Sequence, residues 1–92
     1  MVKTIKEYLN EINEGTFLLH SIDDEDIEET LELQKIIEFT KCELVADSET
    51  LEFNFDNGEV FEIMIDDICD VSIIFGELII ILEDLTRITF TF

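Results

Sequence analysis

"TLEFNFDNGEVFEIMI", residues 50–65, reads as two short strands joined by a turn. Apolar side chains alternate with mostly polar ones on both sides of the turn, which is typical of strands with one buried face: Leu51, Phe53, Phe55, Phe61, Ile63 and Ile65. Between the two runs, Asp56-Asn57-Gly58 supplies the residue types that hairpin turns favour. The stretch therefore predicts an antiparallel hairpin.

The same strand-like patterning, which begins near residue 43, continues to residue 92. "DVSIIF" and "LIIIL" are separated by a reversal at Gly76-Glu77, and "LTRITFTF" follows a polar turn at Glu83-Asp84. Because consecutive strands with short connections pair as neighbours, we predict an antiparallel β-meander of about five strands.

The first 40 residues are more helical in pattern. In "TIKEYLNEINE", residues 4–14, apolar residues recur at helical spacing before Gly15, which predicts an amphipathic helix. We also predict a second helix over about residues 23–37, although alternating apolar positions leave residues 30–40 open between helix and strand. The expected fold is a single α+β domain over residues 1–92, with one or two N-terminal helices packed on the meander.

The strands "SIIF" and "LIIIL" are apolar at consecutive positions, so both of their faces need cover. Helices on one face would leave the other exposed. We therefore expect a homodimer that packs through the sheet or its edge. The alternative is that the meander curls into a small barrel and covers itself.

Composition excludes several classes of protein. Twenty-four acidic residues against 5 basic ones give a formal charge of -19, too few cations for a phosphate-binding surface, so we expect no direct nucleic-acid binding. The eight Phe and the Ile runs favour a folded chain over a disordered one. No run is long enough for a membrane span, and the N-terminus lacks a signal peptide, so we expect a cytoplasmic protein without membrane contact. Cys42 and Cys69 are expected to be two buried, unpaired thiols.

Residue types for catalysis or metal binding are scarce. His20 is the one histidine and has no nucleophile in a recognisable context beside it. If Gly58 were position 6 of an EF-hand loop, the ligand positions 1 and 3 would be Phe53 and Phe55, which cannot bind calcium. We therefore expect no enzyme activity, no cofactor and no metal site.

The acidic residues themselves are the candidate site. A compact chain of this length is about 32 Å across, and duplex DNA of that length carries about 19 phosphates. Helical spacing would align Glu7, Glu11 and Glu14 on one face and Asp24, Glu28 and Glu32 on another. The alternative is an acidic face that is merely solvated. The predicted partner-binding, DNA-mimicking carboxylates are Glu7, Glu11, Glu14, Asp23, Asp24, Glu25, Asp26, Glu28, Glu29, Glu32, Asp66, Asp67 and Asp70.

In length, charge and the run from "MVKTIKEYLNEINEG" to "TRITFTF", the chain resembles the small acidic DNA mimics of phages, in particular the anti-restriction nuclease (Arn) family of T-even phages. The resemblance covers the whole chain. It implies a dimeric DNA mimic that works in the host bacterial cytoplasm. It further implies evasion of host defence by binding the modification-dependent restriction endonuclease McrBC, which would protect phage DNA.

Two other functions remain open at this point. An immunity protein that neutralises a basic nuclease toxin would share the electrostatics but would present a sharply shaped epitope with a few dominant side chains. A small carboxylate hydrolase or calcium-binding module would instead bind Ca²⁺ or Mg²⁺ tightly and stoichiometrically.

Overall fold

The computed structural model describes residues 2–12, 14–23 and 30–91. Its one α-helix among these residues comes first and is followed by strands and a short 3-10 helix, which confirms the predicted α+β class. In chain order the elements are α1 (Val2–Glu11), β1 (Gly15–Asp23), β2 (Thr30–Phe39), β3 (Cys42–Ala46), β4 (Thr50–Phe55), β5 (Val60–Met64), the 3-10 helix η1 (Ile65–Asp67), β6 (Ile68–Ile74), β7 (Glu77–Leu82) and β8 (Arg87–Thr91).

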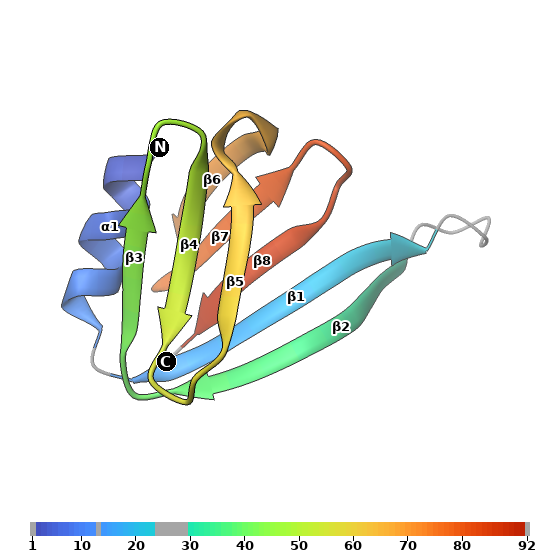
Figure 1. Cartoon of the computed structure of the whole chain (residues 1–92). Coiled ribbons are helices and arrows are strands. Elements are labelled where there is room, and N and C mark those ends of the chain that lie inside the picture. Colours follow the sequence, from blue (N-terminus) through green and yellow to red (C-terminus); the bar gives the residue numbers. More distant parts are fainter. Residues whose placement is uncertain (1, 13, 24–29, 92) are drawn as a thin grey trace.

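The strands form two antiparallel sheets. The large sheet has five strands in the order β2-β1-β8-β7-β6, and the small sheet has three in the order β3-β4-β5. Figure 1 shows the small sheet lying in front of part of the large one, with α1 beside it and the β1–β2 hairpin extending beyond it. The predicted meander is therefore divided, because η1 carries the chain from the small sheet to the large one.

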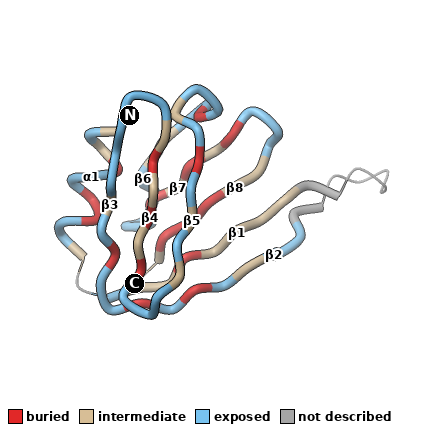
Figure 2. Tube along the Cα trace, viewed as in Figure 1, coloured by how far each residue is buried: buried red, intermediate tan, exposed pale blue. Residues whose placement is uncertain are grey.

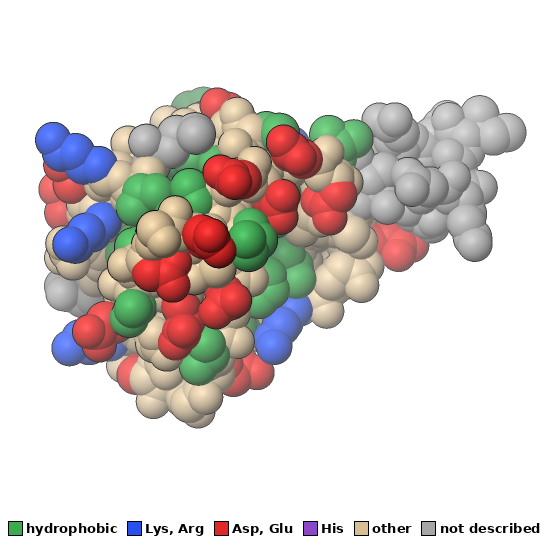
Figure 3. Space-filling view, turned by 45° about the horizontal axis from the view of Figure 1, so that its top comes forward, with side chains coloured by type: hydrophobic (Ala, Val, Ile, Leu, Met, Phe, Trp, Pro, Cys, Tyr) green, Lys and Arg blue, Asp and Glu red, His purple; other side chains and the backbone are tan. Residues whose placement is uncertain are grey.

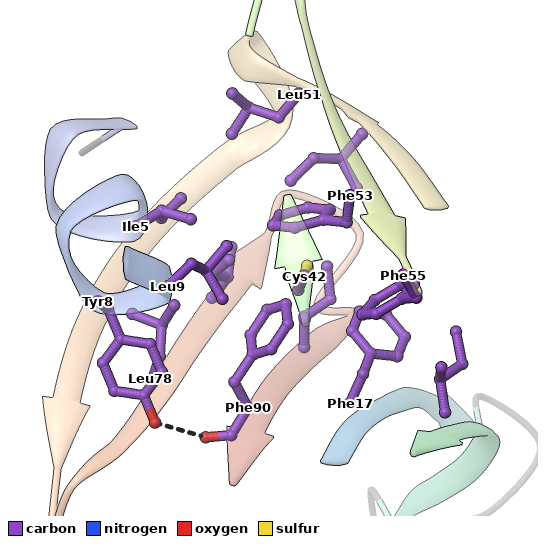
Figure 4. Close-up of a cluster of buried hydrophobic side chains, with 14 of the residues drawn as sticks. Ile5, Tyr8, Leu9, Phe17, Cys42, Leu51, Phe53, Phe55, Leu78 and Phe90 are labelled. Atoms are coloured by element: carbon purple, nitrogen blue, oxygen red, sulfur yellow. Dashed lines mark hydrogen bonds between the residues drawn. The ribbon is translucent and has the colours of Figure 1, made fainter. Parts of the chain in front are cut away.

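Aromatic side chains fill the space between the two sheets. Phe17 and Phe90 come from the large sheet, and their ring centroids lie 5.4 Å apart. Phe17 also contacts Phe55 and Phe61 of the small sheet, with centroids 5.4 and 5.1 Å away, and Phe53 contacts Phe90 at 5.4 Å. Figure 4 shows Phe17, Phe53, Phe55 and Phe90 gathered in this core, and Figure 2 shows that both sheets contain buried stretches. Edge-to-face and tilted ring contacts of this kind add to the stabilisation that burial provides.

Helix α1 closes one side of this core. Its buried residues Ile5, Tyr8 and Leu9 are the apolar stripe that the sequence predicted. The Tyr8 hydroxyl donates to the carbonyl oxygens of Gly76 and Phe90, at 2.7 and 3.2 Å, and so ties the helix to the large sheet (Figure 4). Burial raises the pKa of Tyr8 above its ordinary value.

The hairpin predicted over residues 50–65 is confirmed. Leu51 pairs with Ile63 and Phe53 with Phe61, and the predicted inward positions are buried or half-buried. The turn is closed by hydrogen bonds from the Phe55 N–H to the Glu59 carbonyl and from the Gly58 N–H to the Phe55 carbonyl, at 2.9 and 3.0 Å. Gly58 has φ 94°, which explains the glycine at that position.

The predicted second helix over about residues 23–37 is wrong where the structure describes it. Thr30–Phe39 is strand β2, paired with β1 along its length, and residues 24–29 lie outside the described residues. Residues 16–20 belong to β1. The predicted helix end is also shifted: α1 ends at Glu11, and Gly15 begins β1, where a Cβ would collide with the carbonyl oxygen of Thr91.

Candidate functional site: an acidic face on the small sheet

The carboxylates predicted near the N-terminus lie on or just after helix α1. Glu7, Glu11 and Glu14 are all exposed. The negative charge of Glu7 is compensated, because the Lys3 ammonium, one helical turn away, lies 3.9 Å from the Glu7 carboxylate. Lys6 adds a second cation to the same short helix. The helix surface is therefore of mixed charge rather than a continuous row of carboxylates.

The predicted row of Asp24, Glu28 and Glu32 on one helix face is wrong at Glu32, the one member that the structure describes. Glu32 is an exposed residue of strand β2. Asp23 is the last residue of β1. The other predicted carboxylates of this segment lie outside the described residues: Asp24, Glu25, Asp26, Glu28 and Glu29. Glu32 therefore does not lie on the helix face that the predicted row required.

The third predicted group is divided between two surfaces. Asp66 and Asp67 lie in η1, at the crossing between the sheets, and both are exposed. Asp70 lies on β6 opposite Ile81, on the side of the large sheet that faces away from the core. Those of the predicted carboxylates that the structure describes therefore do not come together into one site.

A more compact acidic group lies on the outward face of the small sheet, and the sequence prediction missed it. We call the "acidic face" the outward positions of β3, β4 and β5, which include Glu43, Glu52 and Glu62. Their inward neighbours Cys42, Phe53 and Ile63 are buried in the core, so strand alternation turns these glutamates to solvent. The face is therefore a direct product of the same period-two pattern that builds the core.

Cross-strand pairing sets the spacing of these glutamates. Glu52 pairs directly with Glu62, a position in which Cβ atoms lie about 4.5–5.5 Å apart. Glu43 pairs with Asn54, which makes it a diagonal neighbour of Glu52 at about 7–8 Å. The three carboxylates thus form a row that crosses all three strands of the small sheet.

No cation relieves this row within the sheet. Strands β3, β4 and β5 contain no Lys or Arg. Two ion pairs are found among the described residues. One joins Lys3 to Glu7 on α1, and the other joins Lys35 of β2 to Glu59 in the hairpin turn, at 3.5 Å. Like charges directly opposite on a sheet are destabilising, so the Glu52–Glu62 pair is a cost that the fold itself does not explain.

Apolar side chains are interspersed with these glutamates. Val45, Val60 and Met64 point outward from the same strands and are 49%, 54% and 42% exposed. Figure 3 shows acidic and apolar side chains alternating over the viewed face, with the basic ones toward its margins. A surface of this kind offers a protein partner both charge and apolar contact.

Three other carboxylates serve the turns, and their hydrogen bonds distinguish them from the acidic face. Asp47 accepts the N–H groups of Glu49 and Thr50, each at 2.8 Å, which lower its pKa. The Thr40 hydroxyl and N–H do the same for the pKa of Asp56. The Thr86 hydroxyl and N–H lower the pKa of Asp84. These carboxylates have a structural role that needs no partner.

Other chemistry finds little support in the part of the chain that is described. No group of three or more His, Cys, Asp or Glu there could hold a metal ion. The two thiols are unpaired. Cys42 is buried as predicted, and burial raises its pKa to about 12, whereas Cys69 is exposed, so its predicted burial is wrong. No helix among the described residues is long and apolar enough to cross a bilayer.

The comparisons with known proteins add no relative: no family model, no curated protein and no solved structure matches the chain.

The sequence contained a pattern that could have located the acidic face. In residues 50–65, alternation placed Phe53 and Phe61 inward, and the same alternation places Glu52 and Glu62 outward. Once the hairpin register is set by the turn, these two glutamates must face each other. The prediction instead followed the density of carboxylates along the chain, which led to residues 21–30.

Proposed function

We propose that the protein is a DNA-mimic inhibitor that occupies the DNA-binding surface of a host restriction endonuclease and so protects phage DNA. McrBC is the candidate enzyme, as the resemblance to the anti-restriction family implies. The observation that carries the proposal is the Glu52–Glu62 pair, because two carboxylates face each other on an outward surface without a cation on their sheet. A binding partner that supplies Lys and Arg would relieve their repulsion.

The net charge of -19 supports the same partner class. A nuclease surface that binds duplex DNA presents cations that release counterions from phosphates. A dense row of carboxylates can take the place of those phosphates, and long-range attraction accelerates the encounter of oppositely charged proteins. Binding should therefore weaken as ionic strength rises.

The test measures how much of the protein is needed to displace modified duplex DNA from purified McrBC. The acidic-face variant combines Glu43→Gln, Glu52→Gln and Glu62→Gln. The matched control removes the same number of charges from the N-terminal group with Glu7→Gln, Glu11→Gln and Glu14→Gln. We expect the wild-type protein to displace DNA, the acidic-face variant to require at least about tenfold more protein, and the control to change little.

Two results would contradict the proposal. Wild-type protein that leaves the DNA on McrBC at low salt would reject this enzyme as the target. Displacement that is insensitive to salt would reject electrostatic mimicry, because contacts between exposed charges are screened over about 8 Å at physiological ionic strength. A larger effect of the control triplet would move the contact surface to α1.

A second candidate function has a specific observation in its favour. Val45, Val60 and Met64 lie exposed among the glutamates, and partly apolar epitopes with a few dominant side chains are typical of immunity proteins that neutralise a nuclease toxin. An alanine scan of the acidic face separates the two functions. Gradual loss of binding over many glutamates favours mimicry, and collapse at Val60 or Met64 favours a toxin-specific epitope.

A further inference from the structure

The turn between β6 and β7 presents an aromatic ring to solvent. Ile74 pairs with Glu77, which leaves Phe75 and Gly76 as a two-residue turn with positive φ at both positions. Turns of this kind favour Asn followed by Gly, because these residues tolerate the left-handed backbone. Phe75 stands where Asn is preferred, and its ring is fully exposed. The ring therefore strains the turn without burying apolar surface in the core.

The apolar surface continues from Phe75 into the end of β6. Ile73 and Ile74 are 52% and 49% exposed, so adjacent apolar side chains reach solvent here. We call residues 73–76 the "apolar tip". Contiguous exposed apolar side chains mark interaction sites, and residues held in an unfavourable backbone conformation concentrate at functional sites. Both observations indicate that the apolar tip is a contact surface.

Leu85 provides a comparison within the same sheet. Phe75 and Leu85 are the two non-glycine residues with positive φ in the described part of the chain, at 52° and 69°. The side chain of Leu85 is only half exposed, and its N–H donates to the Leu82 carbonyl at 2.9 Å. Partial burial thus offsets the strain at Leu85, and the fully exposed Phe75 has no such compensation within the fold.

The apolar tip and the acidic face lie on different sides of a small molecule. Figure 1 shows β6 and β7 behind the small sheet. The Tyr8 hydroxyl donates to the Gly76 carbonyl at 2.7 Å and so fixes the turn to α1. The two shorter extents of the molecule are 27 and 26 Å. A cleft that encloses the protein can therefore contact the acidic face and the apolar tip at the same time.

Charge and shape define what the apolar tip can bind. Glu77 borders it, and the net charge of -19 favours a basic partner and disfavours an anionic membrane. One ring on a narrow turn is convex, so it fits a pocket better than a flat surface. A nuclease that depends on base modification has to read a base, and enzymes that take a base out of the stack hold it between aromatic or apolar side chains. Such a pocket accepts a flat apolar ring.

We propose that Phe75 inserts into a base-binding pocket of the target nuclease. This inference rests on the proposed function and deepens it: the glutamates of the acidic face take the place of phosphates, and the Phe75 ring takes the place of an unstacked base. Base-like contact explains why Phe is present in a turn that favours Asn. Contacts between exposed charges are screened by salt, whereas stacking of rings is not, so the two parts of the interface respond differently to ionic strength.

The test uses the displacement of modified duplex DNA from purified McrBC at low and at physiological salt. Phe75→Asn should require at least about tenfold more protein than wild type, by a similar factor at both salt concentrations. The loss caused by the acidic-face variant should instead shrink as salt rises. Phe75→Trp keeps a flat ring and should remain close to wild type, whereas Phe75→Leu keeps only an apolar side chain and should resemble Phe75→Asn.

Leu85→Asn is the matched control, because it relieves the other positive φ and removes an exposed apolar side chain at a different turn. It should leave DNA displacement unchanged. Since Asn suits the backbone of the β6–β7 turn, a loss of binding in Phe75→Asn does not come from unfolding, and circular dichroism checks this.

The outcomes separate this inference from the proposed function. Wild-type protein that does not displace DNA would reject the target, and the insertion of Phe75 with it. Equal displacement by wild type and Phe75→Asn would overturn the insertion alone. Wild-type behaviour of Phe75→Leu would show that a flat ring is not what the pocket reads. Binding to phosphatidylcholine vesicles that requires Phe75, without an effect on displacement, would assign the ring to a lipid surface and also overturn the proposal.

Discussion

Phe75 is the most exposed large apolar residue that the structure describes, with its side chain 102% accessible. Together with Gly76 it forms the turn between β6 and β7, and both residues have positive φ, 52° and 81°. Turns of this kind favour Asn or Gly, because other side chains strain the left-handed backbone by about 1–2 kcal/mol. Phe75 is thus unfavourable both in its backbone and in its exposure.

Phe75→Asn should therefore raise the free energy of unfolding, by about 1 kcal/mol. Asn tolerates the left-handed conformation, whereas nothing in the folded chain is lost with the exposed ring. Urea unfolding followed by circular dichroism measures the change. Phe75→Ala is the control, since it removes the ring but keeps the strain, and should gain less. An equal gain for Ala and Asn would show that backbone strain is not the cause.

Asp56 is a carboxylate whose role is structural. The hydroxyl and N–H of Thr40 donate to it and hold its pKa below the ordinary value. A lowered folded-state pKa contributes stability above the unfolded-state pKa, and this contribution is lost as pH falls through the folded value. The Thr40–Asp56 contact links the loop after β2 to the β4–β5 turn.

Asp56→Asn should lower the thermal midpoint at pH 7, and the difference from wild type should shrink as the pH is lowered through the acidic range. Thermal unfolding at a series of pH values gives both quantities. Asp66→Asn removes one exposed charge without breaking such a turn and is the control. A difference that stays constant down to the lowest pH would mean that the ionised carboxylate is not what stabilises the turn.

Among the elements, the β4–β5 hairpin could be predicted because all of its determinants are local. Turn residues, alternation and register lie within residues 50–65. The β1–β2 hairpin could not, because its pairing slips between Leu19 and His20: Leu19 pairs with Lys35 but His20 with Leu33, which leaves Gln34 unmatched. Such a bulge interrupts the period of two, and the remaining spacing of Leu33, Ile36 and Ile37 imitates a helix.

The site was predicted less well than the fold for a related reason. Carboxylate density along the chain says little about which carboxylates meet in space, since Glu52 and Glu62 become neighbours only through strand pairing. Division of the meander between two sheets was equally hidden, because η1 has no distinctive composition beyond its two aspartates. Which side chains become neighbours on the surface of a sheet can be predicted only once the register of its strands is known.

Glu52→Lys should stabilise the fold and at the same time weaken binding to the nuclease. Opposite charges facing each other across strands are favourable by about 0.2–1 kcal/mol, so the repulsion with Glu62 becomes an attraction. Chemical denaturation measures the first effect and DNA displacement the second. Glu43→Lys is the control for stability, because it faces Asn54 rather than an acid and should gain less. Destabilisation by Glu52→Lys would mean that the pair is not under strain.

The molecule as a whole carries a charge of -19, which opposes compaction. Added salt screens this self-repulsion within the folded chain. The thermal midpoint should therefore rise with sodium chloride over the same range in which nuclease binding weakens. Scanning calorimetry in a salt series tests this, with sucrose as an uncharged control for general stabilisation. A midpoint that falls with salt would indicate that attractive ion pairs outweigh the repulsion.

The pairing of β1 with β8 also bears on the order in which the protein can fold. Phe17 lies beside Phe90, so β1 finds its neighbour only after β8, the last strand in the chain order of the described residues, has been synthesised. Local hairpins close quickly, whereas contacts between distant segments must first overcome the entropy of a long loop. The small sheet, with its acidic face, can form while the chain is still growing. The large sheet is completed after the small one, because β8 is the strand that joins β1 to β7. Until β8 has been synthesised, β1 is not connected to β7, and its apolar inner side lacks this part of the sheet.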